Sequence, residues 1–498
     1  MNTEYTAQAL QILRLFVWGI SLLALVYGLS VGIFMVLENR SPQLTFAWLL
    51  LFFTLPVVGV IIYFMFGRDH WAFSRENKLL RQELRHLAKS NEHLAELASQ
   101  QKAEMEKLKQ AGPPVYGRVL ELLRRNTESS LFPYNNLEIL QNGSEKYPRL
   151  IEDMRAAQHS IHLEYYEWSS DEFMQGIKQL LLDKVKEGVE VRIMYDPIGS
   201  FFMLNWAYVR EMNAGGVKMV PYSPLYFIHT ISYRNHRKIA VIDGGIGYTG
   251  GMNMAETYLK GPRKGKFTGW RDTHVRFTGQ AVWGLQASFI IQWYNTTQEW
   301  LADSIYFPPL RDTPGYLPLQ VVNSGPDSQW KAIRQLYFAM ITAAQHHIYI
   351  QSPFFILDES LAEALSGAAR AGVDVKVMLA PNGPDGDFAY RVGFTYAENM
   401  AEAGVQIFHY QGDYFHVKTI NIDSALCSIG SANMDIRSFA INYELNLIIY
   451  DEKTAKELEQ DFVHDLSHCQ EFKLKVYKRN NFFGRVRDSV FRLASPLL

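Results

Sequence analysis

Two long apolar runs, Leu15–Leu37 and Leu44–Phe66, dominate the start of the chain. Each is long enough to cross a hydrocarbon core of about 30 Å as a helix, and only a short polar segment separates them. The pattern predicts a hairpin of two transmembrane helices within residues 1–70. Basic residues are concentrated after the second run, whereas only Arg14 precedes the first; they are Arg68, Arg75, Lys78, Arg81 and Arg85. The positive-inside rule therefore predicts a multi-pass protein of the cell membrane whose N-terminus and main body are cytoplasmic.

A charged helical segment follows over residues 71–115, and Gly112 with the two prolines after it ends the helix. Apolar residues recur at heptad a and d positions: Leu80, Leu84, Leu87, Leu94, Ala98, Met105 and Leu108. Asn91 and Gln101 interrupt this apolar frame. Two interpretations remain open. The segment forms a short coiled coil that joins two subunits into a homodimer, or it is a solvated helix that lies against its own catalytic body.

From about Tyr116 onward the pattern predicts two α/β halves in tandem, residues 116–320 and 321–498. The first half begins with a strand over 161–166, a helix through Leu182 and a strand over 189–195. The second half repeats this order, with a strand over 348–351, a helix through Ala369 and a strand over 373–379. Gly188 and Gly372 stand at equivalent points, which makes the duplication visible without any motif. The predicted fold class is α/β, built from two similar halves.

Composition excludes several classes of protein. The formal net charge is −2, so no global basic field attracts the chain to nucleic acid. Cys427 and Cys469 are the only cysteines, which fits a reducing compartment and argues against a disulfide framework. They lack the paired spacing of a structural zinc site. The sequence also has no Gly-x-x-x-x-Gly-Lys-Ser/Thr loop, which argues against an NTPase.

One motif, His-x-Lys followed by four residues and Asp, occurs twice in the chain. The two copies are His236, Lys238, Asp243 and His416, Lys418, Asp423. Each is followed by a small, polar Gly-x-x-Asn sequence: Gly250-Gly251-Met252-Asn253 and Gly430-Ser431-Ala432-Asn433. A single histidine on a strand usually has a structural role. Two complete copies with the same tail indicate a functional site.

The residue types of this repeat suit phosphate chemistry. Both motifs run into β-branched strands, so the His and the Lys, two positions apart, share one face. Lysine is a compact charge for phosphate, and imidazole exchanges protons near neutral pH. The small residues of the tails let backbone N–H groups approach an anion. We therefore predict phosphate binding at Gly250, Gly251, Gly430 and Ser431.

These repeats match the HKD motifs of the phospholipase D superfamily, and the sequence around them resembles that of bacterial cardiolipin synthases. Five phrases carry the resemblance: YDPIGS from Tyr195, NHRK from Asn235, YTGGMN from Tyr248, WRDTH from Trp270 and NYE from Asn442. The resemblance covers most of the chain and is interrupted mainly by the charged segment. It implies that the two halves, each phospholipase D-like, pack about a pseudo-two-fold axis that brings His236 and His416 together.

The resemblance also implies a mechanism without a metal or other cofactor. One histidine attacks phosphorus and forms a covalent intermediate. The other protonates the departing alkoxide and then deprotonates the incoming hydroxyl. The family analogy assigns His236 as the nucleophile and His416 as the acid and base, although the motif itself is symmetric.

Other residues would support this chemistry. The charge that develops on the phosphoryl oxygens is expected to be held by Lys238, Lys418, Asn253 and Asn433. Each histidine needs an acceptor for its second ring nitrogen, and we expect Glu444 to serve His416 and Asp272 to serve His236. Asp243 and Asp423 close the motifs and are expected to serve structure more than chemistry.

An anionic phospholipid at the cytoplasmic face of the membrane is the expected substrate. The membrane hairpin favours it, and so do aromatic residues near the first motif and a basic C-terminal tail; these are Tyr226, Phe227, Tyr233, Lys473, Lys475, Lys478, Arg479, Arg485, Arg487 and Arg492. Together with the resemblance, these features predict phosphatidyl transfer between two phosphatidylglycerol molecules, which yields cardiolipin and glycerol.

Three alternatives remain open. Hydrolysis or head-group exchange of the phospholipase D type would use the same residues. A nuclease of the superfamily is disfavoured by the balanced charge and the membrane hairpin, and nucleic acid is therefore not an expected partner. A non-catalytic membrane scaffold is disfavoured because both motifs are intact.

Overall fold

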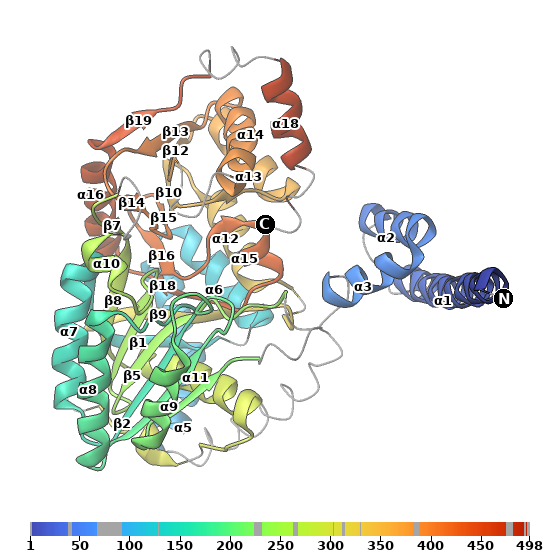
Figure 1. Cartoon of the computed structure of the whole chain (residues 1–498). Helices are drawn as coiled ribbons and strands as arrows, with labels where there is room; N and C mark the ends of the chain where they lie inside the picture. Colours follow the sequence, from blue (N-terminus) through green and yellow to red (C-terminus); the bar gives the residue numbers. More distant parts are fainter. Residues whose placement is uncertain are drawn as a thin grey trace. The chain divides into compact units, whose positions relative to one another are not determined.

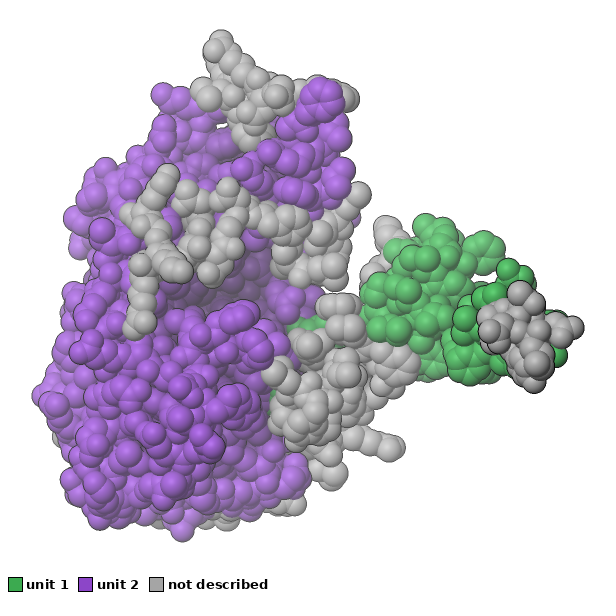
Figure 2. Space-filling model, in the orientation of Figure 1, with its two compact units in different colours: residues 1–70, 223–233 green, residues 71–222, 234–498 purple. Residues whose placement is uncertain are grey.

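The computed structural model describes residues 2–37, 42–66, 92–127, 129–223, 232–261, 267–301, 303–310, 314–328, 330–381, 388–474, 482–492 and 495 (Figure 1). The chain divides into two compact units, which Figure 2 colours separately. Unit 1 comprises residues 1–70 and 223–233, and unit 2 comprises residues 71–222 and 234–498.

The described part of unit 1 contains three apolar helices: α1 (Asn2–Leu37), α2 (Pro42–Thr54) and α3 (Pro56–Phe66). Within the described residues, only the part of α1 over Leu10–Leu37 is long and apolar enough by itself to cross a membrane. The second predicted span is not one long helix, because it bends at Leu55. Pro56 lacks an N–H donor and disfavours the helical conformation of the residue before it. The prediction of two long transmembrane helices is therefore corrected to one long helix and two short ones.

The helices of unit 1 pack closely through small residues. A Cβ atom added to Gly28 would lie 2.9 Å from the side chain of Phe52, and one added to Gly32 would lie 2.4 Å from that of Leu49. Met35, Phe52 and Tyr63, one from each helix, form a small buried cluster. Glycines at these two positions therefore let α1 and α2 approach each other, as in helix pairs of membrane proteins.

The described part of unit 2 is built on a sheet of fifteen strands. The first half contributes β1 (Leu131–Gln141), β2 (Ser160–Tyr165), β3 (Glu190–Tyr195), β4 (Lys218–Pro221), β5 (Lys238–Ile242), β6 (Ile246–Gly250) and β8 (Thr273–Gly279). The second half contributes β9 (Tyr316–Ser324), β10 (His347–Ser352), β12 (Asp374–Leu379), β13 (Gln406–Tyr410), β15 (Thr419–Ile422), β16 (Leu426–Gly430), β18 (Glu444–Ile449) and β19 (Cys469–Glu471).

The strand order of this sheet has a pseudo-two-fold symmetry. Its centre is the antiparallel pair of β1 and β9. Outward from β1 come β8, β6, β5, β2, β3 and β4, and outward from β9 come β18, β16, β15, β10, β12 and β13, followed by β19. Each of these strands except β19 therefore has a counterpart in the other half. The predicted strand–helix–strand repeats begin with the parallel pairs β2–β3 and β10–β12.

Helices cover both faces of the sheet. One face of the first half is covered by α7 (Asn142–Ala156), α8 (Glu172–Lys186) and α9 (Trp206–Ala214), and the second half has α12 (Ala332–Ala343), α13 (Glu359–Arg370) and α14 (Phe388–Glu402). The other face is covered by α11 (Ala281–Thr297) and α16 (Glu452–Leu466). The period of two in each strand decides the face: Ile239 and Val241 join the cluster under α11, while Ala240 and Ile242 join the one under α7 and α8.

Several short elements complete the described part of unit 2. They are α10 (Thr257–Lys260), the 3₁₀ turn Ser304–Tyr306, α15 (Ile436–Ala440), α18 (Phe482–Arg492), β7 (Trp270–Arg271), β11 (Phe355–Ile356), β14 (Tyr414–Phe415) and β17 (Met434–Asp435). In the basic tail, Arg492 of α18 lies over the ring of Tyr396 in α14. Tyr226 and Phe227, and the tail residues Lys475, Lys478 and Arg479, lie outside the described residues.

The boundaries of the halves differ from the prediction at two places. The predicted division between residues 320 and 321 falls inside β9. Helix α6 (Pro114–Asn126), which falls mostly in the predicted first half, contributes Val115 and Leu120 to the core of the second half. Sequence order assigned α6 to its neighbour along the chain, whereas its apolar face is buried against α12.

Helix α5 (Glu92–Ala111) lies against its own body, so the second interpretation of the charged segment holds for this part. Leu97, Met105 and Leu108 are buried. Gln101, a polar interruption in the coiled-coil frame, accepts a hydrogen bond from the N–H of Leu131 at 2.7 Å and donates one to its carbonyl at 2.6 Å. The amide thus satisfies the backbone at the start of β1. Residues 67–91, with Leu80, Leu84 and Leu87 of the heptad frame, lie outside the described residues.

Candidate active site

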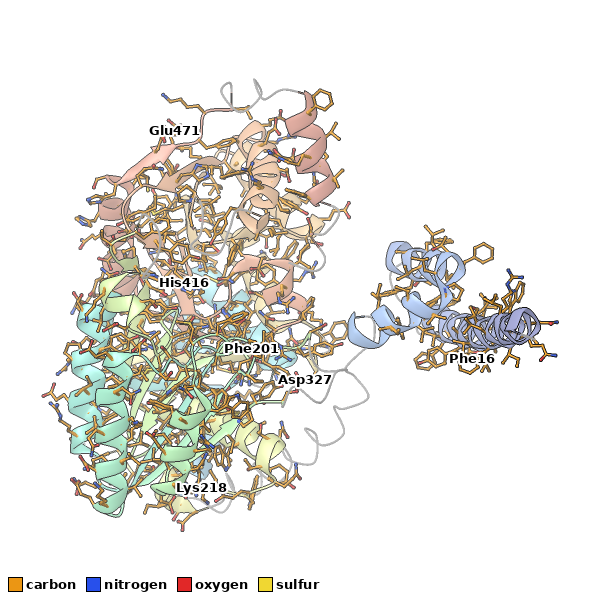
Figure 3. The ribbon with its side chains drawn as sticks, viewed as in Figure 1. Phe16, Phe201, Lys218, Asp327, His416 and Glu471 are labelled. Carbon is orange, nitrogen blue, oxygen red and sulfur yellow. The ribbon has the colours of Figure 1, made fainter. Side chains whose placement is uncertain are left out.

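The backbone next to each motif histidine is hydrogen-bonded to the opposite half of unit 2. The N–H of His236 donates to the carbonyl of Tyr443 at 2.9 Å, and the N–H of His416 donates to that of Arg271 at 2.8 Å. In addition, β14, directly before His416, pairs with β7, and Asn235 forms a bridge with Tyr443. The two motifs therefore lie where the halves interlock, and His416 is seen near the middle of unit 2 in Figure 3.

Each histidine takes its carboxylate partner from the opposite half. Nδ1 of His236 lies 3.0 and 3.1 Å from the two carboxylate oxygens of Glu444. Nδ1 of His416 lies 2.8 Å from Oδ2 of Asp272. The predicted pairing of Glu444 with His416 and of Asp272 with His236 is therefore wrong. Glu444 begins β18 and Asp272 directly precedes β8, and these strands flank the central β9–β1 pair, so each carboxylate faces across the junction.

The motif lysines complete one charge cluster that both halves share. Nζ of Lys238 donates to the carbonyl of His236 at 2.7 Å, and Nζ of Lys418 donates to that of His416 at 2.6 Å. Each ammonium group also interacts electrostatically with both Glu444 and Asp272. The side chains needed to hold an anion therefore meet at a single site.

Burial sets the protonation states in this cluster. It lowers the pKa of His236 to about 4, against the opposing effect of Glu444. It lowers the pKa of His416 to about 3, and Lys418 acts in the same direction. It also lowers the pKa of Lys238 to about 7 and that of Lys418 to about 8, although the carboxylates oppose this. Both imidazoles are thus neutral near pH 7, as a nitrogen nucleophile must be.

The Nδ1 bonds leave the other nitrogen of each ring for chemistry. Ionised carboxylates only accept hydrogen bonds, so Nδ1 carries the proton and Nε2 presents its lone pair. Within the described residues, neither Nε2 atom has a hydrogen-bond partner in the protein. This tautomer and orientation suit nucleophilic attack by one ring and proton transfer by the other.

Aromatic rings pack on both histidines. The Tyr166 ring lies 4.9 Å from that of His236, and the Trp270 and Tyr258 rings lie 5.2 and 6.2 Å from that of His416. Neither motif predicts a role for these three residues. For Tyr166, its position in the sequence could have indicated a role. It directly follows β2, and the sites of α/β sheets form at the carboxyl ends of parallel strands.

Three of the four residues predicted to bind phosphate use their backbone N–H groups within the protein. The N–H groups of Gly251, Gly430 and Ser431 all donate to backbone carbonyls, and the hydroxyl of Ser431 donates to Glu444. These donors are not available to a phosphate, so the structure does not support the prediction for these three residues; for Gly250 it stays a prediction. The absence of a side chain at two of these positions allows neighbouring side chains to pack closely. A Cβ on Gly251 would lie 2.0 Å from the Asp272 carboxylate, and one on Gly430 would lie 2.3 Å from the Asn446 side chain.

The asparagines of the two tails differ in their contacts. The Asn253 side chain donates to the hydroxyl of Tyr258 at 3.0 Å. In Asn433, Oδ1 is buried without a hydrogen-bond partner. Their assignment to the phosphoryl oxygens stays a prediction.

Asp243 and Asp423 bind backbone, as expected of structural residues. Asp243 accepts the N–H groups of residues 158, 159 and 160, and Asp423 accepts those of residues 345, 346 and 347, all at 2.7–3.0 Å. Each carboxylate therefore fixes the chain just before the strand that pairs with its own, β2 or β10.

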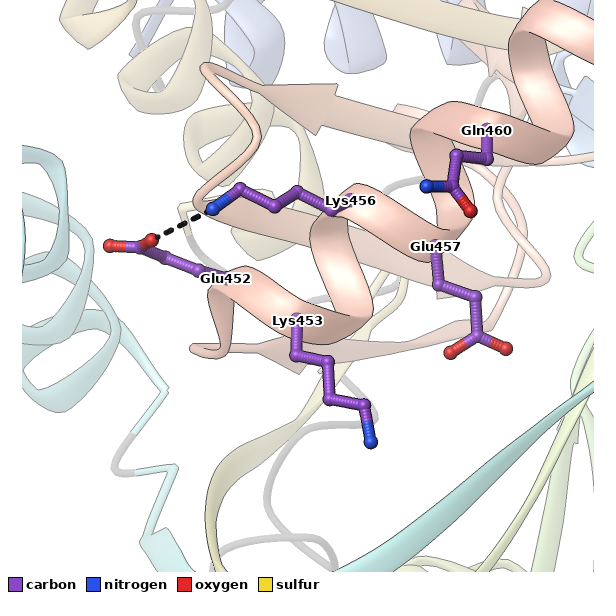
Figure 4. Close-up of a pocket in the computed structure, with 5 residues that line it drawn as sticks. All are labelled: Glu452, Lys453, Lys456, Glu457 and Gln460. Atoms are coloured by element: carbon purple, nitrogen blue, oxygen red, sulfur yellow. Dashed lines mark hydrogen bonds and ion pairs between the residues drawn. The ribbon is translucent and has the colours of Figure 1, made fainter.

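The recess in Figure 4 lies along α16 and is lined by Glu452, Lys453, Lys456, Glu457 and Gln460, none of which contacts the histidine cluster. In the described ranges, no group of three or more His, Cys, Asp or Glu side chains is arranged to hold a metal ion.

A doubled sheet with two HKD motifs at its junction defines a phospholipase D-like protein. The chain is 38% identical over 490 residues to a cardiolipin synthase of Alkalihalophilus pseudofirmus, covering 97% of this chain and 95% of the relative. It is 39% identical to one of Geobacillus kaustophilus, covering 93% and 90% of the two chains. The pattern of the family "Cardiolipin synthase, PLD-like domain" matches residues 150–262 and 337–466. The chain belongs to the cardiolipin synthase family.

Two further comparisons describe its parts. Residues 20–68 match the family "Phospholipase_D-nuclease N-terminal", which places α2 and α3 with α1 in one N-terminal segment. The crystal structure of phosphatidylserine synthase from Haemophilus influenzae has the same fold, with a TM-score of 0.56 at 15% identity, covering 76% of this chain and all of that one. The predicted family and the two phospholipase D-like segments are thus confirmed.

Proposed function

We propose that the protein is a cardiolipin synthase that transfers a phosphatidyl group from one phosphatidylglycerol to a second, releasing glycerol. The observation that carries this proposal is the crossed pair of histidine–carboxylate contacts, His236 with Glu444 and His416 with Asp272. It supplies two imidazoles with oriented, reactive Nε2 atoms at one site. Family membership supplies the substrate class.

In the first step, the Nε2 lone pair of His236 attacks phosphorus. An N–P bond forms, and the bond from phosphorus to the head-group glycerol breaks. The departing alkoxide takes a proton from Nε2 of His416. Burial and Lys418 keep His416 neutral in the empty site, and the arriving phosphate anion raises its pKa so that it can hold this proton.

In the second step, the terminal hydroxyl of another phosphatidylglycerol loses its proton to His416. Its oxygen forms a P–O bond while the N–P bond breaks, which yields cardiolipin and restores neutral His236. Lys238 and Lys418 offset the charge on the phosphoryl oxygens through both steps. The rings of Tyr166, Tyr258 and Trp270 around the histidines limit access of water, which would divert the intermediate to phosphatidic acid.

We further propose that unit 1 crosses the membrane twice and holds unit 2 on the cytoplasmic side. Across the bend, Leu55 donates to the carbonyl of Leu51 and Gly59 donates to that of Leu55, so α2 and α3 can act as one bent span. Their combined length of about 37 Å, at roughly 1.5 Å per residue, exceeds a hydrocarbon core. The basic residues that follow support the cytoplasmic assignment.

The proposal is tested with radiolabelled phosphatidylglycerol and purified full-length protein, comparing wild type, His236→Ala and His416→Ala. We expect wild type to produce cardiolipin and glycerol in equal amounts, and each variant to lose at least about 10³-fold in rate. His464→Ala, which removes an exposed histidine of α16, serves as the matched control. Phosphatidic acid as the main product would favour a hydrolase, and no turnover by wild type would favour a scaffold.

A further inference from the structure

The turn between β3 and α9 exposes three aromatic side chains, Phe201, Phe202 and Trp206, which we call the aromatic tip. Their exposed fractions are 58%, 95% and 74%. The rings of Phe201 and Phe202 contact each other edge to face at 5.0 Å, and Figure 3 labels Phe201. Large apolar side chains gathered on a surface mark a contact with a partner or a membrane.

Hydrogen bonds hold this turn in place, so the exposure is not a consequence of a loose loop. The hydroxyl of Ser200 accepts from the N–H of Trp168 at 3.0 Å. The N–H of Ser170 donates to the carbonyl of Met203 at 3.0 Å, and its hydroxyl accepts from the N–H of Asn205 at 3.1 Å. Met203 and Leu204 pack against the core of the first half. The turn therefore buries its middle and presents its aromatic residues outward.

The same turn borders the active site through two contacts. Asp196 accepts the N–H of Ile198 at 2.9 Å with one carboxylate oxygen and the N–H of Asn235, next to His236, at 2.9 Å with the other. A Cβ on Gly199 would lie 2.4 Å from the carbonyl of Tyr166, whose ring packs on His236. The aromatic tip is thus joined to the segment that carries the proposed nucleophile.

We propose that the aromatic tip inserts into the head-group region of the bilayer and docks the entrance of the active site on the leaflet that supplies the lipid. This inference rests on the proposed function, because only a lipid substrate requires such docking. Phe and Trp are the side chains that favour the membrane interface. Arg210, one helical turn after Trp206 and also exposed, adds a cation that attracts anionic head groups.

A bilayer fits the aromatic tip better than a second copy of the chain does. Three aromatic side chains at these exposures can bury roughly 400–600 Å², less than the roughly 800 Å² per partner of a stable protein interface. A bilayer sets no such minimum, since each inserted ring contributes separately. Helix α1 is also long and apolar enough to cross a membrane, which favours a bilayer as the partner.

Depth-dependent quenching in proteoliposomes tests the insertion directly. The full-length chain carries Phe202→Cys, labelled with an environment-sensitive fluorophore, in a Cys469→Ser background; Cys427 is buried. The matched control places the label on exposed Lys186→Cys at the end of α8. We expect acyl chains brominated near the head group to quench the label at position 202 and not at 186. Equal quenching, or a signal that depends on the protein-to-lipid ratio alone, as a second copy would produce, overturns the proposal.

Kinetics with two forms of the substrate give an independent test. The triple variant Phe201→Ser, Phe202→Ser, Trp206→Ser is compared with Phe338→Ser, an exposed aromatic residue of α12. We expect turnover of bilayer phosphatidylglycerol to fall about tenfold in the triple variant and that of a dispersed short-chain analogue to stay within about twofold. Equal losses on both substrates, or no loss on either, overturn the proposal. If wild type makes no cardiolipin from either substrate, the proposed function fails, and the quenching measurement still decides the insertion.

Discussion

A single hydrogen bond decides what each motif histidine can do. With Nδ1–H donated to a buried carboxylate, the ring is fixed in one tautomer and one orientation, and only Nε2 faces a substrate. Burial raises the pKa of Glu444, but His236, Lys238 and Ser431 outweigh this effect and hold the pKa below its ordinary value. Glu444 thus stays ionised and stabilises the positive charge that His236 gains on attacking phosphorus.

The crossed pairing predicts opposite leaving-group effects for the two carboxylates. With phosphatidylglycerol, Glu444→Gln and Asp272→Asn should each lower kcat by about 10²-fold or more. A phosphatidyl p-nitrophenol substrate needs no proton on its leaving group, so release of nitrophenol should recover to within about tenfold of wild type in Asp272→Asn. It should not recover in Glu444→Gln, because that carboxylate orients the nucleophile. Stopped-flow release of nitrophenol measures both variants, and recovery in Glu444→Gln alone would restore the pairing within each half.

At the scale of elements, Asp423 accepts three backbone N–H groups at the start of β10, and we expect its role to be structural. Asp423→Asn keeps the side-chain shape and tolerates the positive φ of 55°, but weakens three charge-assisted N–H bonds. We expect the free energy of unfolding to fall by about 2–3 kcal/mol, with kcat per folded molecule unchanged. Thermal unfolding and active-site titration check this, with exposed Glu471→Gln as the control. A loss of kcat without a loss of stability would return Asp423 to the catalytic residues.

Local pattern was enough to predict most elements of the sheet. The period of the apolar residues and the glycine turns predicted strands beginning near Ile161, Val189 and Val373, with helices between them. The structure has these elements at those positions. The errors have local causes that hydropathy does not register. Pro56 bends a run whose apolar character is continuous, and Gln101, polar in a heptad, is satisfied by the backbone of a strand thirty residues away.

At the scale of the molecule, the sequence predicted the histidines, lysines and carboxylates that the structure brings together, but not which carboxylate pairs with which histidine. The strand order has a pseudo-two-fold symmetry, and a symmetric motif is compatible with acids from the same half or from the opposite half. Only the junction of β1 with β9 decides between them, because it brings Glu444 to His236 and Asp272 to His416. The sequence also did not show that the N–H groups of Gly251 and Ser431 are already bonded, because their carbonyl partners, Thr273 and Leu445, become neighbours only when the strands pair.

The shared charge cluster predicts a pH dependence that belongs to both halves together. When Lys238 and Lys418 are protonated, their two charges balance the carboxylates of Glu444 and Asp272, and the site accepts an anionic phosphodiester. The lysines lose this charge as pH rises through about 7 and about 8, which leaves the empty site negative. At low pH the nucleophile is lost only when His236 becomes protonated, near pH 4.

We expect kcat/KM to fall on the alkaline side by about tenfold per pH unit for each lysine that loses its proton. Bound phosphate raises both lysine pKa values, so kcat should stay level to higher pH than kcat/KM. Steady-state rates in mixed micelles between pH 5 and 10 measure both parameters, and a kcat/KM that stays flat up to pH 9 would show that the lysine charges do not control substrate capture.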